Sequence, residues 1–457
     1  MTAKSRGAKE DDEAGTIPHE KPEGVTPPAK EGEGPVRRFL DLLGPGLITG
    51  ASDDDPSGIG TYTSAGAALG FSTLWTAVVT LPLMAAVQFV CAKIGMVCGK
   101  GMAGVLRDHY PRWVLYLSVA LLCVANTINV GTDIGAISAA INLVLPGSAQ
   151  ALVSIKLLIV PVALSIVVLQ VLGSYRLIAR VFKWLSLTLF AYIAAAFLAR
   201  PHWGEVLRNT FVPHVSFDGN YLLTVVAILG TTISPYLFFW QASEEVEEEV
   251  QMGRTTLEER EGATHEELKH ASLDTFIGML FCNVVFYFVI LASAATLHAH
   301  GQTDVQSATD AARALEPFAG SAAKYLFAVG LIGAGFLAVP VLSGSAAYAV
   351  AETFGWKYGL DTKPRQAKQF YAVIAVSTAV GMLINFTGIN PIRALFWTAV
   401  INGLLAPPLL VLIMFVSNNP KVMGIHTNNK LTNALGWAAA VIMVAAAAGM
   451  ILTWNQQ

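Results

Sequence analysis

Two short polar stretches interrupt otherwise apolar segments of this sequence, and they hold the residues best suited to chemistry. The first covers residues 52–58 and reads SDDDPSG, and the second covers residues 230–236 and reads GTTISPY. Each contains a proline, which breaks or kinks a helix. An unwound segment leaves backbone carbonyl oxygens without helical partners, and such oxygens suit a hard cation when a carboxylate and a hydroxyl lie beside them. The two stretches therefore predict a cation site built from oxygen ligands.

Asp55, directly before Pro56, is the strongest candidate ligand. An ionisable group at membrane depth is costly and is retained mainly where a cavity or pathway uses it. The second stretch offers Thr231, through its carbonyl or its hydroxyl, and the Ser234 hydroxyl. Asp54 is a candidate neighbour of the site. Neither stretch contains Cys, Met or His, so soft or imidazole ligands for a transition metal are not offered there.

Two structural alternatives stay open for these stretches. Asp before Pro is a common start of a helix, so Asp53, Asp54 or Asp55 can serve only as a cap for a helix that begins at Pro56. The 234–235 pair can be an ordinary proline kink whose freed carbonyls are satisfied by nearby hydroxyls.

The composition is that of an all-α integral membrane protein. Of 457 residues, 54% are hydrophobic and 13% are charged, and the mean hydropathy is +0.54. Apolar runs of about 20 residues, long enough to cross a bilayer, recur after residue 39. This excludes a nucleic-acid-binding protein, a secreted disulfide scaffold and an ordinary cytosolic enzyme. The net charge of −3 suggests no polyanionic partner. The four cysteines lie in apolar runs. No cofactor is expected.

The chain divides into a tail and a membrane domain. Residues 1–38 are rich in charge, Pro and Gly, which predicts a disordered cytoplasmic tail. Residues 39–457 are expected to form a transmembrane domain with eleven spans: 39–69, 71–97, 113–143, 149–172, 178–199, 221–243, 271–297, 320–350, 367–386, 391–416 and 433–454. Because Lys and Arg concentrate in the connections on one side, we expect a cytoplasmic N-terminus and an extracellular C-terminus. A prokaryotic plasma membrane is the expected location.

The two interrupted spans occupy matching places in two halves of five spans. The first half covers 39–199, the second covers 221–416, and 433–454 is an extra helix. Discontinuous helices in corresponding positions indicate an inverted-repeat transporter whose binding site lies between them. Five spans is an odd number, so the second half inserts with the opposite topology.

Several motifs resemble the natural-resistance-associated macrophage protein (NRAMP) family of divalent-metal transporters. Residues 44–46 (GPG) and 55–58 (DPSG) resemble that family's GPG and Asp-Pro-Gly-Asn motifs on its first helix. Residues 91–99, 110–113, 132–134 and 418–424 resemble later parts of the same family. The resemblance covers nearly the whole chain from Gly44 and implies a LeuT-type 5+5 inverted repeat with discontinuous helices 1 and 6.

The departures from the family motifs bear on the ion. The family's ligands are an Asp and an Asn on helix 1, and an Ala carbonyl and a Met thioether on helix 6. The resemblance maps these positions to Asp55, Gly58, Thr231 and Ser234. Loss of the sulfur and of two larger side chains predicts a roomier, oxygen-lined site that suits hydrated Mg²⁺, with Mn²⁺ also accepted. These departures look like the NRAMP-related magnesium transporters.

The resemblance also bears on proton coupling. Positions that the family associates with proton movement are Tyr236, Ala136 and Gln241 here, and all nine histidines fall in the tail, loops or helix ends. Obligatory proton coupling is therefore not expected, although the Asp133 carboxylate remains on the third span as a pathway candidate. Asn402, inside the tenth span, is a candidate partner for a metal-bound water or else an interhelical hydrogen-bonding residue.

Four rival functions stay open at this stage. The first is a proton-coupled Mn²⁺/Fe²⁺ importer, which belongs to the same class of transporter but carries different ions. A sodium-coupled amino-acid symporter keeps the fold and changes the substrate. An intramembrane enzyme would need a nucleophile or a metal-protease motif such as HExxH, which the spans lack. A channel or ion-sensing receptor is compatible with the spans, but two broken helices favour alternating access. The oligomeric state is left open.

Overall fold

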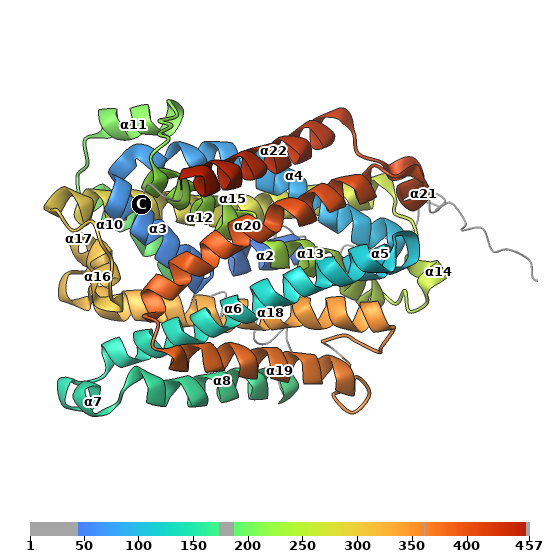
Figure 1. Ribbon diagram of the computed structural model, residues 1–457, viewed down its shortest axis with the longest axis horizontal. Helices are drawn as coiled ribbons and strands as arrows, with labels where there is room; N and C mark the ends of the chain where they lie inside the picture. The colour runs from blue at the N-terminus through green and yellow to red at the C-terminus, as the bar shows by residue number, and fades with distance from the viewer. Residues whose placement is uncertain (1–43, 173–186, 361, 454–457) are drawn as a thin grey trace, which may run out of the picture.

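The protein is built almost entirely of helices, as the computed structural model shows (Figure 1). It describes residues 44–172, 187–360 and 362–453, and within these ranges there is no β-strand. The predicted tail, 1–38, lies outside the described residues.

The long helices agree closely with the predicted spans. They are α4 (Trp75–Cys98), α6 (Arg112–Val144), α8 (Ile155–Leu172), α15 (His265–Thr296), α18 (Ala323–Phe354), α19 (Lys368–Ile384), α20 (Pro391–Ser417) and α22 (Lys430–Thr453). Shorter helices connect them: α5 (Met102–His109), α7 (Gly147–Leu152), α10 (Ala191–Leu198), α11 (Trp203–Phe211), α14 (Leu257–Arg260), α16 (Ala308–Ala312), α17 (Glu316–Ala319) and α21 (Pro420–Met423).

Eight helical segments in the described residues are long and apolar enough to cross a membrane. The helices α8 and α10 are apolar but shorter, and the first predicted span is divided in two. The fifth predicted span, 178–199, lies partly outside the described residues. The protein is an integral membrane protein, and the count of eleven spans stays a prediction.

Both predicted helix breaks are present. The first span consists of α2 (Pro45–Asp53) and α3 (Pro56–Leu69), and the sixth consists of α12 (Gly219–Thr232) and α13 (Pro235–Gln251). In each case proline is the first residue of the second half-helix, where its missing N–H removes no helical hydrogen bond. Proline thus starts a new helix at each break rather than merely kinking a continuous one.

The half-helices α2 and α13 each pack against the second span of the opposite half of the chain. A Cβ atom placed on Gly50 of α2 would stand 2.1 Å from the carbonyl oxygen of Gly278 on α15. In the same way, a Cβ on Gly95 of α4 would stand 2.3 Å from the carbonyl oxygen of Ala242 on α13. Glycine therefore permits backbone-to-backbone contact at both crossings. This exchange of partners is the arrangement expected of two related halves.

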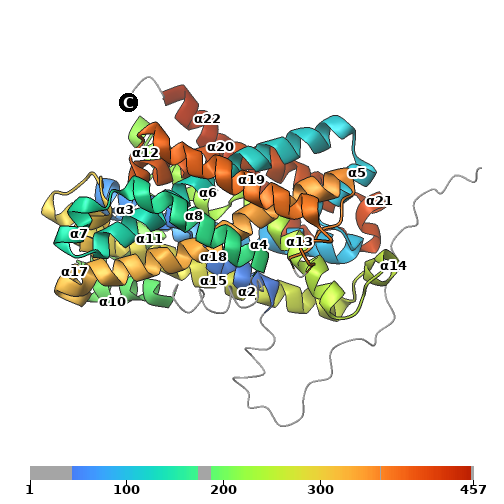
Figure 2. The same ribbon diagram turned by 90° about the horizontal axis from the view of Figure 1, so that it is seen from below.

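In Figure 1, α13 lies in the middle of the molecule, between α22 and α19, and Figure 2, seen from below, shows α8 and α19 side by side on the near face. In the most apolar 18-residue stretch of residues 219–251, 100% of the residues are buried, against 33% in the corresponding stretches of α19 and α22. The breaks are therefore enclosed by other helices, and α8 and α19 form an outer layer.

Candidate metal-binding site

Asp55 lies at the first break, as the N-cap residue of α3. Its Oδ1 accepts a hydrogen bond from the Gly58 N–H at 2.6 Å, and the Ser57 hydroxyl donates to Oδ1 at 2.8 Å and to Oδ2 at 3.0 Å. Asp55 therefore caps α3, as one structural alternative predicted. Capping does not exclude a ligand role, because a carboxylate carries more lone pairs than these bonds use.

The second break brings Thr231 beside Asp55 across Gly58. A Cβ on Gly58 would stand 3.2 Å from Thr231 Oγ1 and 3.3 Å from Asp55 Oδ1. Thr231 Oγ1 is buried and has no hydrogen-bond partner. The Thr231 hydroxyl and the Asp55 carboxylate thus both face Gly58. Three of the four predicted ligand positions therefore lie together, although the prolines of the two breaks, Pro56 and Pro235, are 179 residues apart in the sequence.

The Ser234 side chain bonds back to the end of α12. Its hydroxyl donates to the carbonyl oxygens of Gly230 at 3.0 Å and of Thr231 at 2.7 Å. These are carbonyls that the end of α12 would otherwise leave without partners. The hydroxyl and the Thr231 carbonyl therefore form a pair of adjacent oxygens, and Ser234 keeps lone pairs to offer to a cation.

The expected extra room beside Gly58 is not there. Besides Thr231 and Asp55, a Cβ on Gly58 would meet Tyr62 Cε2 at 3.2 Å. The Tyr62 ring is held in place by stacking on Phe286 of α15, with ring centroids 4.7 Å apart. The Thr231 hydroxyl and the Tyr62 ring therefore fill the space beside Gly58.

Three more carboxylates lie buried near Asp55. Asp53 and Asp54 directly precede it, and Asp133 of α6 is close enough to Asp55 for the two to interact electrostatically. All are at most 1% exposed. Both carboxylate oxygens of Asp54 lack a hydrogen-bond partner, whereas Asp53 Oδ2 accepts a bond of 3.3 Å from the Cys282 thiol. A cation bound among these carboxylates would offset their mutual repulsion when they are ionised.

Tyr236, the first residue after Pro235, connects the two interrupted spans. Its hydroxyl donates to the Ser52 carbonyl on α2 at 3.0 Å, and its own carbonyl accepts from the Ser345 hydroxyl of α18 at 2.9 Å. Both groups are buried. This hydrogen bond therefore links α13 to α2.

A family model described as natural resistance-associated macrophage protein-like matches residues 46–453. This chain belongs to that family. Among curated relatives, the "Divalent metal cation transporter MntH" of Brucella suis is 26% identical over 417 residues, covering 89% of this chain and 87% of that protein. The NRAMP resemblance is confirmed, and the named relatives are divalent-metal transporters rather than members of a magnesium branch.

Solved structures show the same fold. A manganese transporter from Eremococcus coleocola superposes with a TM-score of 0.69 at 19% identity, covering 96% of this chain and 90% of that one. Mhp1, described as a nucleobase-cation-symport-1 family transporter, gives a TM-score of 0.59 at 14% identity, with 91% and 93% covered. The LeuT-type fold is therefore confirmed. The protein is a transporter and not an enzyme, which removes the intramembrane-enzyme alternative.

The NRAMP site of this chain offers oxygens and few other donors. In the described part of the chain, no group of three or more His, Cys, Asp or Glu side chains is arranged to hold a metal ion. The eight described histidines lie on short helices, in loops or in the first two turns of α15. The oxygen donors at the two breaks include the Asp55 carboxylate and the hydroxyls of Thr231 and Ser234.

Asn402 is engaged away from the predicted ligands. It forms a reciprocal amide pair with Asn129 of α6, in which each side chain donates to the other at 3.0 and 3.1 Å. Both residues are buried. The contact joins α20 to α6, which favours the interhelical interpretation of Asn402 over a contact with a metal-bound water.

Some residues that position the NRAMP site were not found by sequence reasoning. Asp274 of α15 accepts backbone hydrogen bonds from Gly44 at 2.9 Å and from Gly46 at 2.6 Å, and so anchors the start of α2. The GPG motif identified the glycines, but nothing in the sequence indicated that they would bond to a carboxylate 228 residues away. The pairing of Cys282 with Asp53 was missed for the same reason.

The acidic run after the sixth span, residues 244–249, is largely buried. Glu245 and Glu249 are 5% and 4% exposed. Gln241 donates to Glu245 at 2.8 Å, Arg254 contacts Glu249 at 2.9 Å, and the Tyr348 hydroxyl donates to Glu247 at 2.9 Å. The run therefore joins α13 to α18 and to the connection that follows α13.

Proposed function

We propose that this protein carries divalent metal ions across the membrane through the site between the two breaks, with Mn²⁺ among its substrates. The observation that carries the proposal is the approach of Asp55 and Thr231 from two discontinuous helices in a buried space. Membership of the NRAMP family and the names of the relatives, a divalent metal cation transporter and a manganese transporter, support it.

The geometry suits capture and release of a dication. The buried carboxylate of Asp55 supplies a full charge, while Thr231 and Ser234 replace some waters with neutral oxygens. Such ligands bind a hard cation without the sulfur that would hold a softer metal more tightly. The site residues are at most 1% exposed, so ions can enter or leave only when half-helices move. Alternating access by movement of α2 against α13 follows from this enclosure.

A second candidate substrate is Mg²⁺, and one observation favours it. Ser234 and Gly58 stand where the family places a thioether and an amide, so the donors at the site are all oxygen. Mg²⁺ prefers such donors and keeps several waters. The relatives' names favour Mn²⁺ instead, and both ions share a preference for octahedral oxygen ligands.

The absence of obligatory proton coupling stays a prediction. No imidazole lies at either break, and Tyr236 has no pKa near neutrality in water. Metal would then move down its own gradient, aided by an inside-negative potential. A pH dye inside proteoliposomes tests this: we expect Mn²⁺ uptake with no matching acidification. Acidification that tracks Mn²⁺ entry would show instead that Asp133 or another group carries protons.

Transport itself is tested by uptake into proteoliposomes containing the purified full-length chain. We expect Mn²⁺ entry that is saturable and that Mg²⁺ in excess reduces, because the two ions would share one oxygen-lined site. Liposomes without protein and liposomes containing the Asp55→Asn variant serve as controls. Entry of radiolabelled amino acids but not of Mn²⁺ would refute the proposal and revive the symporter alternative.

A further inference from the structure

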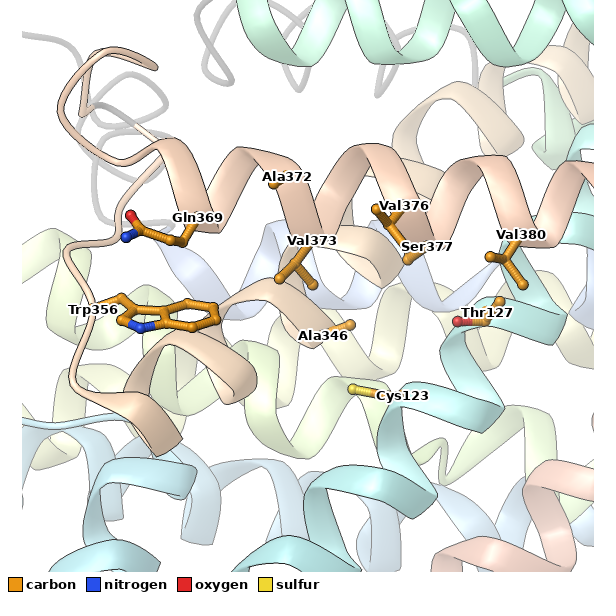
Figure 3. A pocket seen from close by; sticks show the side chains of 10 residues that line it. All are labelled: Cys123, Thr127, Ala346, Trp356, Gln369, Ala372, Val373, Val376, Ser377 and Val380. Carbon is orange, nitrogen blue, oxygen red and sulfur yellow. The ribbon is translucent and has the colours of Figure 1, made fainter.

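An apolar groove runs along α19 (Figure 3). It has a volume of about 390 Å³ and is bounded by α6, α18 and α19. One face of α19 forms its wall, and its floor includes Cys123 of α6 and Ala346 of α18. Val376 and Val380 on the wall are 61% and 48% exposed, so the groove opens toward the lipid-facing side.

The groove spans the depth of one leaflet. Its lining along α19 extends from Gln369 to Val380, a distance of roughly 16 Å at the helical rise of about 1.5 Å per residue. That is about half of a hydrocarbon core of ~30 Å. Directly beyond Val380 the groove is closed, because a Cβ on Gly381 would stand 2.7 Å from the Thr127 carbonyl of α6.

Its other end carries an aromatic and a polar side chain. Trp356 and Gln369 lie side by side there (Figure 3). Trp356 stacks on Phe354 with ring centroids 5.1 Å apart, and Phe354 stacks in turn on Tyr116 of α6 at 6.5 Å. Clustered aromatic side chains with one apolar and one wet face are typical of the headgroup level of a bilayer.

Positive charge collects at this same end. The connection between α18 and α19 lies at the end of the molecule that holds α5 and α14 (Figure 1). Residues 355–368 contain four basic side chains against one acidic residue, Asp361. The four basic residues are exposed: Lys357, Lys363, Arg365 and Lys368. Lys357 directly follows Trp356, and Lys368 directly precedes Gln369, so both flank the mouth of the groove.

We propose that this groove binds one anionic phospholipid, with an acyl chain along α19 and the headgroup at Lys357 and Lys368. The apolar lining accounts for the chain, and the blocked end at Gly381 limits it to one leaflet. The basic mouth accounts for the charge of the headgroup, since basic pockets between helices on the cytoplasmic side bind anionic lipid headgroups. The positive-inside rule places the 355–367 connection on that side.

Native mass spectrometry of the delipidated full-length protein tests the proposal. Dioleoyl phosphatidylglycerol and dioleoyl phosphatidylcholine are added in parallel, because they share acyl chains and differ in headgroup charge. We expect phosphatidylglycerol to bind at least about 10-fold more tightly, with the first molecule bound more tightly than later ones. Equal affinity for the two lipids would overturn the proposal.

Two variants locate the site, each with a matched control. Lys357→Gln combined with Lys368→Gln should weaken the first phosphatidylglycerol about 10-fold, whereas Lys421→Gln combined with Lys430→Gln, away from the groove, should not. Ala372→Trp should block the groove, whereas Val441→Trp on lipid-facing α22 should leave binding unchanged. Thermal unfolding shows that each variant is folded. Binding that survives Ala372→Trp, or that depends on the groove but not on the lysines, would contradict the proposal.

Discussion

The two helix breaks look alike in sequence but make different contributions to the site. The first break holds three consecutive carboxylates, and Asp55 there caps α3 with its side chain. The second holds only neutral oxygens, and the Ser234 hydroxyl bonds back to α12 instead of capping α13. Charge therefore comes from one half of the protein and uncharged ligands from the other. An ion site that needs both halves is sensitive to their relative movement, which is what a transporter requires.

The largest effect is expected from removing the charge at the first break. Asp55→Ala should reduce Mn²⁺ uptake at least about 100-fold, because the attraction of a carboxylate for a nearby dication amounts to several kcal/mol even at an effective dielectric constant of 20. Asp55→Asn is the matched variant, since asparagine caps a helix as well as aspartate does. If Asp55→Asn transports normally, Asp55 acts only as a cap.

A smaller change in selectivity is expected from altering the second break. Ser234→Met, Gly58→Asn and Thr231→Ala together should reduce competition by Mg²⁺ against Mn²⁺ about 10-fold and tighten Cd²⁺ binding, since a thioether favours softer ions. Thr231→Ala is needed because the Thr231 hydroxyl stands 3.2 Å from where the new Cβ would lie. Competition assays and calorimetry measure both quantities. Unchanged Mg²⁺ competition in a folded variant would place selectivity elsewhere.

A modest loss of rate is expected when the link between the breaks is cut. Tyr236→Phe removes the 3.0 Å hydrogen bond to the Ser52 carbonyl and leaves the ring in place. A net loss of about 1 kcal/mol corresponds to roughly a fivefold change in the balance of conformations. We expect slower Mn²⁺ uptake with little change in Mn²⁺ affinity, measured by uptake and calorimetry. A large loss of affinity with unchanged maximal rate would instead make Tyr236 a ligand.

The smallest effect on transport is expected at Asn402. Asn402→Leu leaves buried Asn129 without its partner and should lower stability by about 1–3 kcal/mol. Replacing both asparagines by leucine should recover part of this loss. Ion selectivity should be unchanged in both variants. A shift in the ratio of Mg²⁺ to Mn²⁺ transport would show that Asn402 reaches the ion after all.

Sequence reasoning succeeded where the signal is local. Proline and carboxylates inside apolar runs placed the breaks at Pro56 and Pro235, and α20 begins at Pro391 and ends within one residue of the predicted span. These features depend on neighbouring residues, which the sequence displays directly.

It left open or missed what depends on a distant partner. The sequence offered two interpretations of Asn402, and the choice between them comes from Asn129, 273 residues away. Nothing along the chain indicated that Glu247 would accept a hydrogen bond from Tyr348 of α18. The space beside Gly58 is filled by Thr231 from the other half of the chain. No periodicity or spacing along the sequence encodes such contacts.

The central claim is that one dication binds between the two breaks. Anomalous scattering from crystals soaked in Mn²⁺ tests it most directly. We predict one strong peak coordinated by the Asp55 carboxylate and by oxygens of Thr231 and Ser234, absent from crystals of the Asp55→Asn variant. A peak held by Asp53, Asp54 and Cys282, with none at Asp55, would contradict the account.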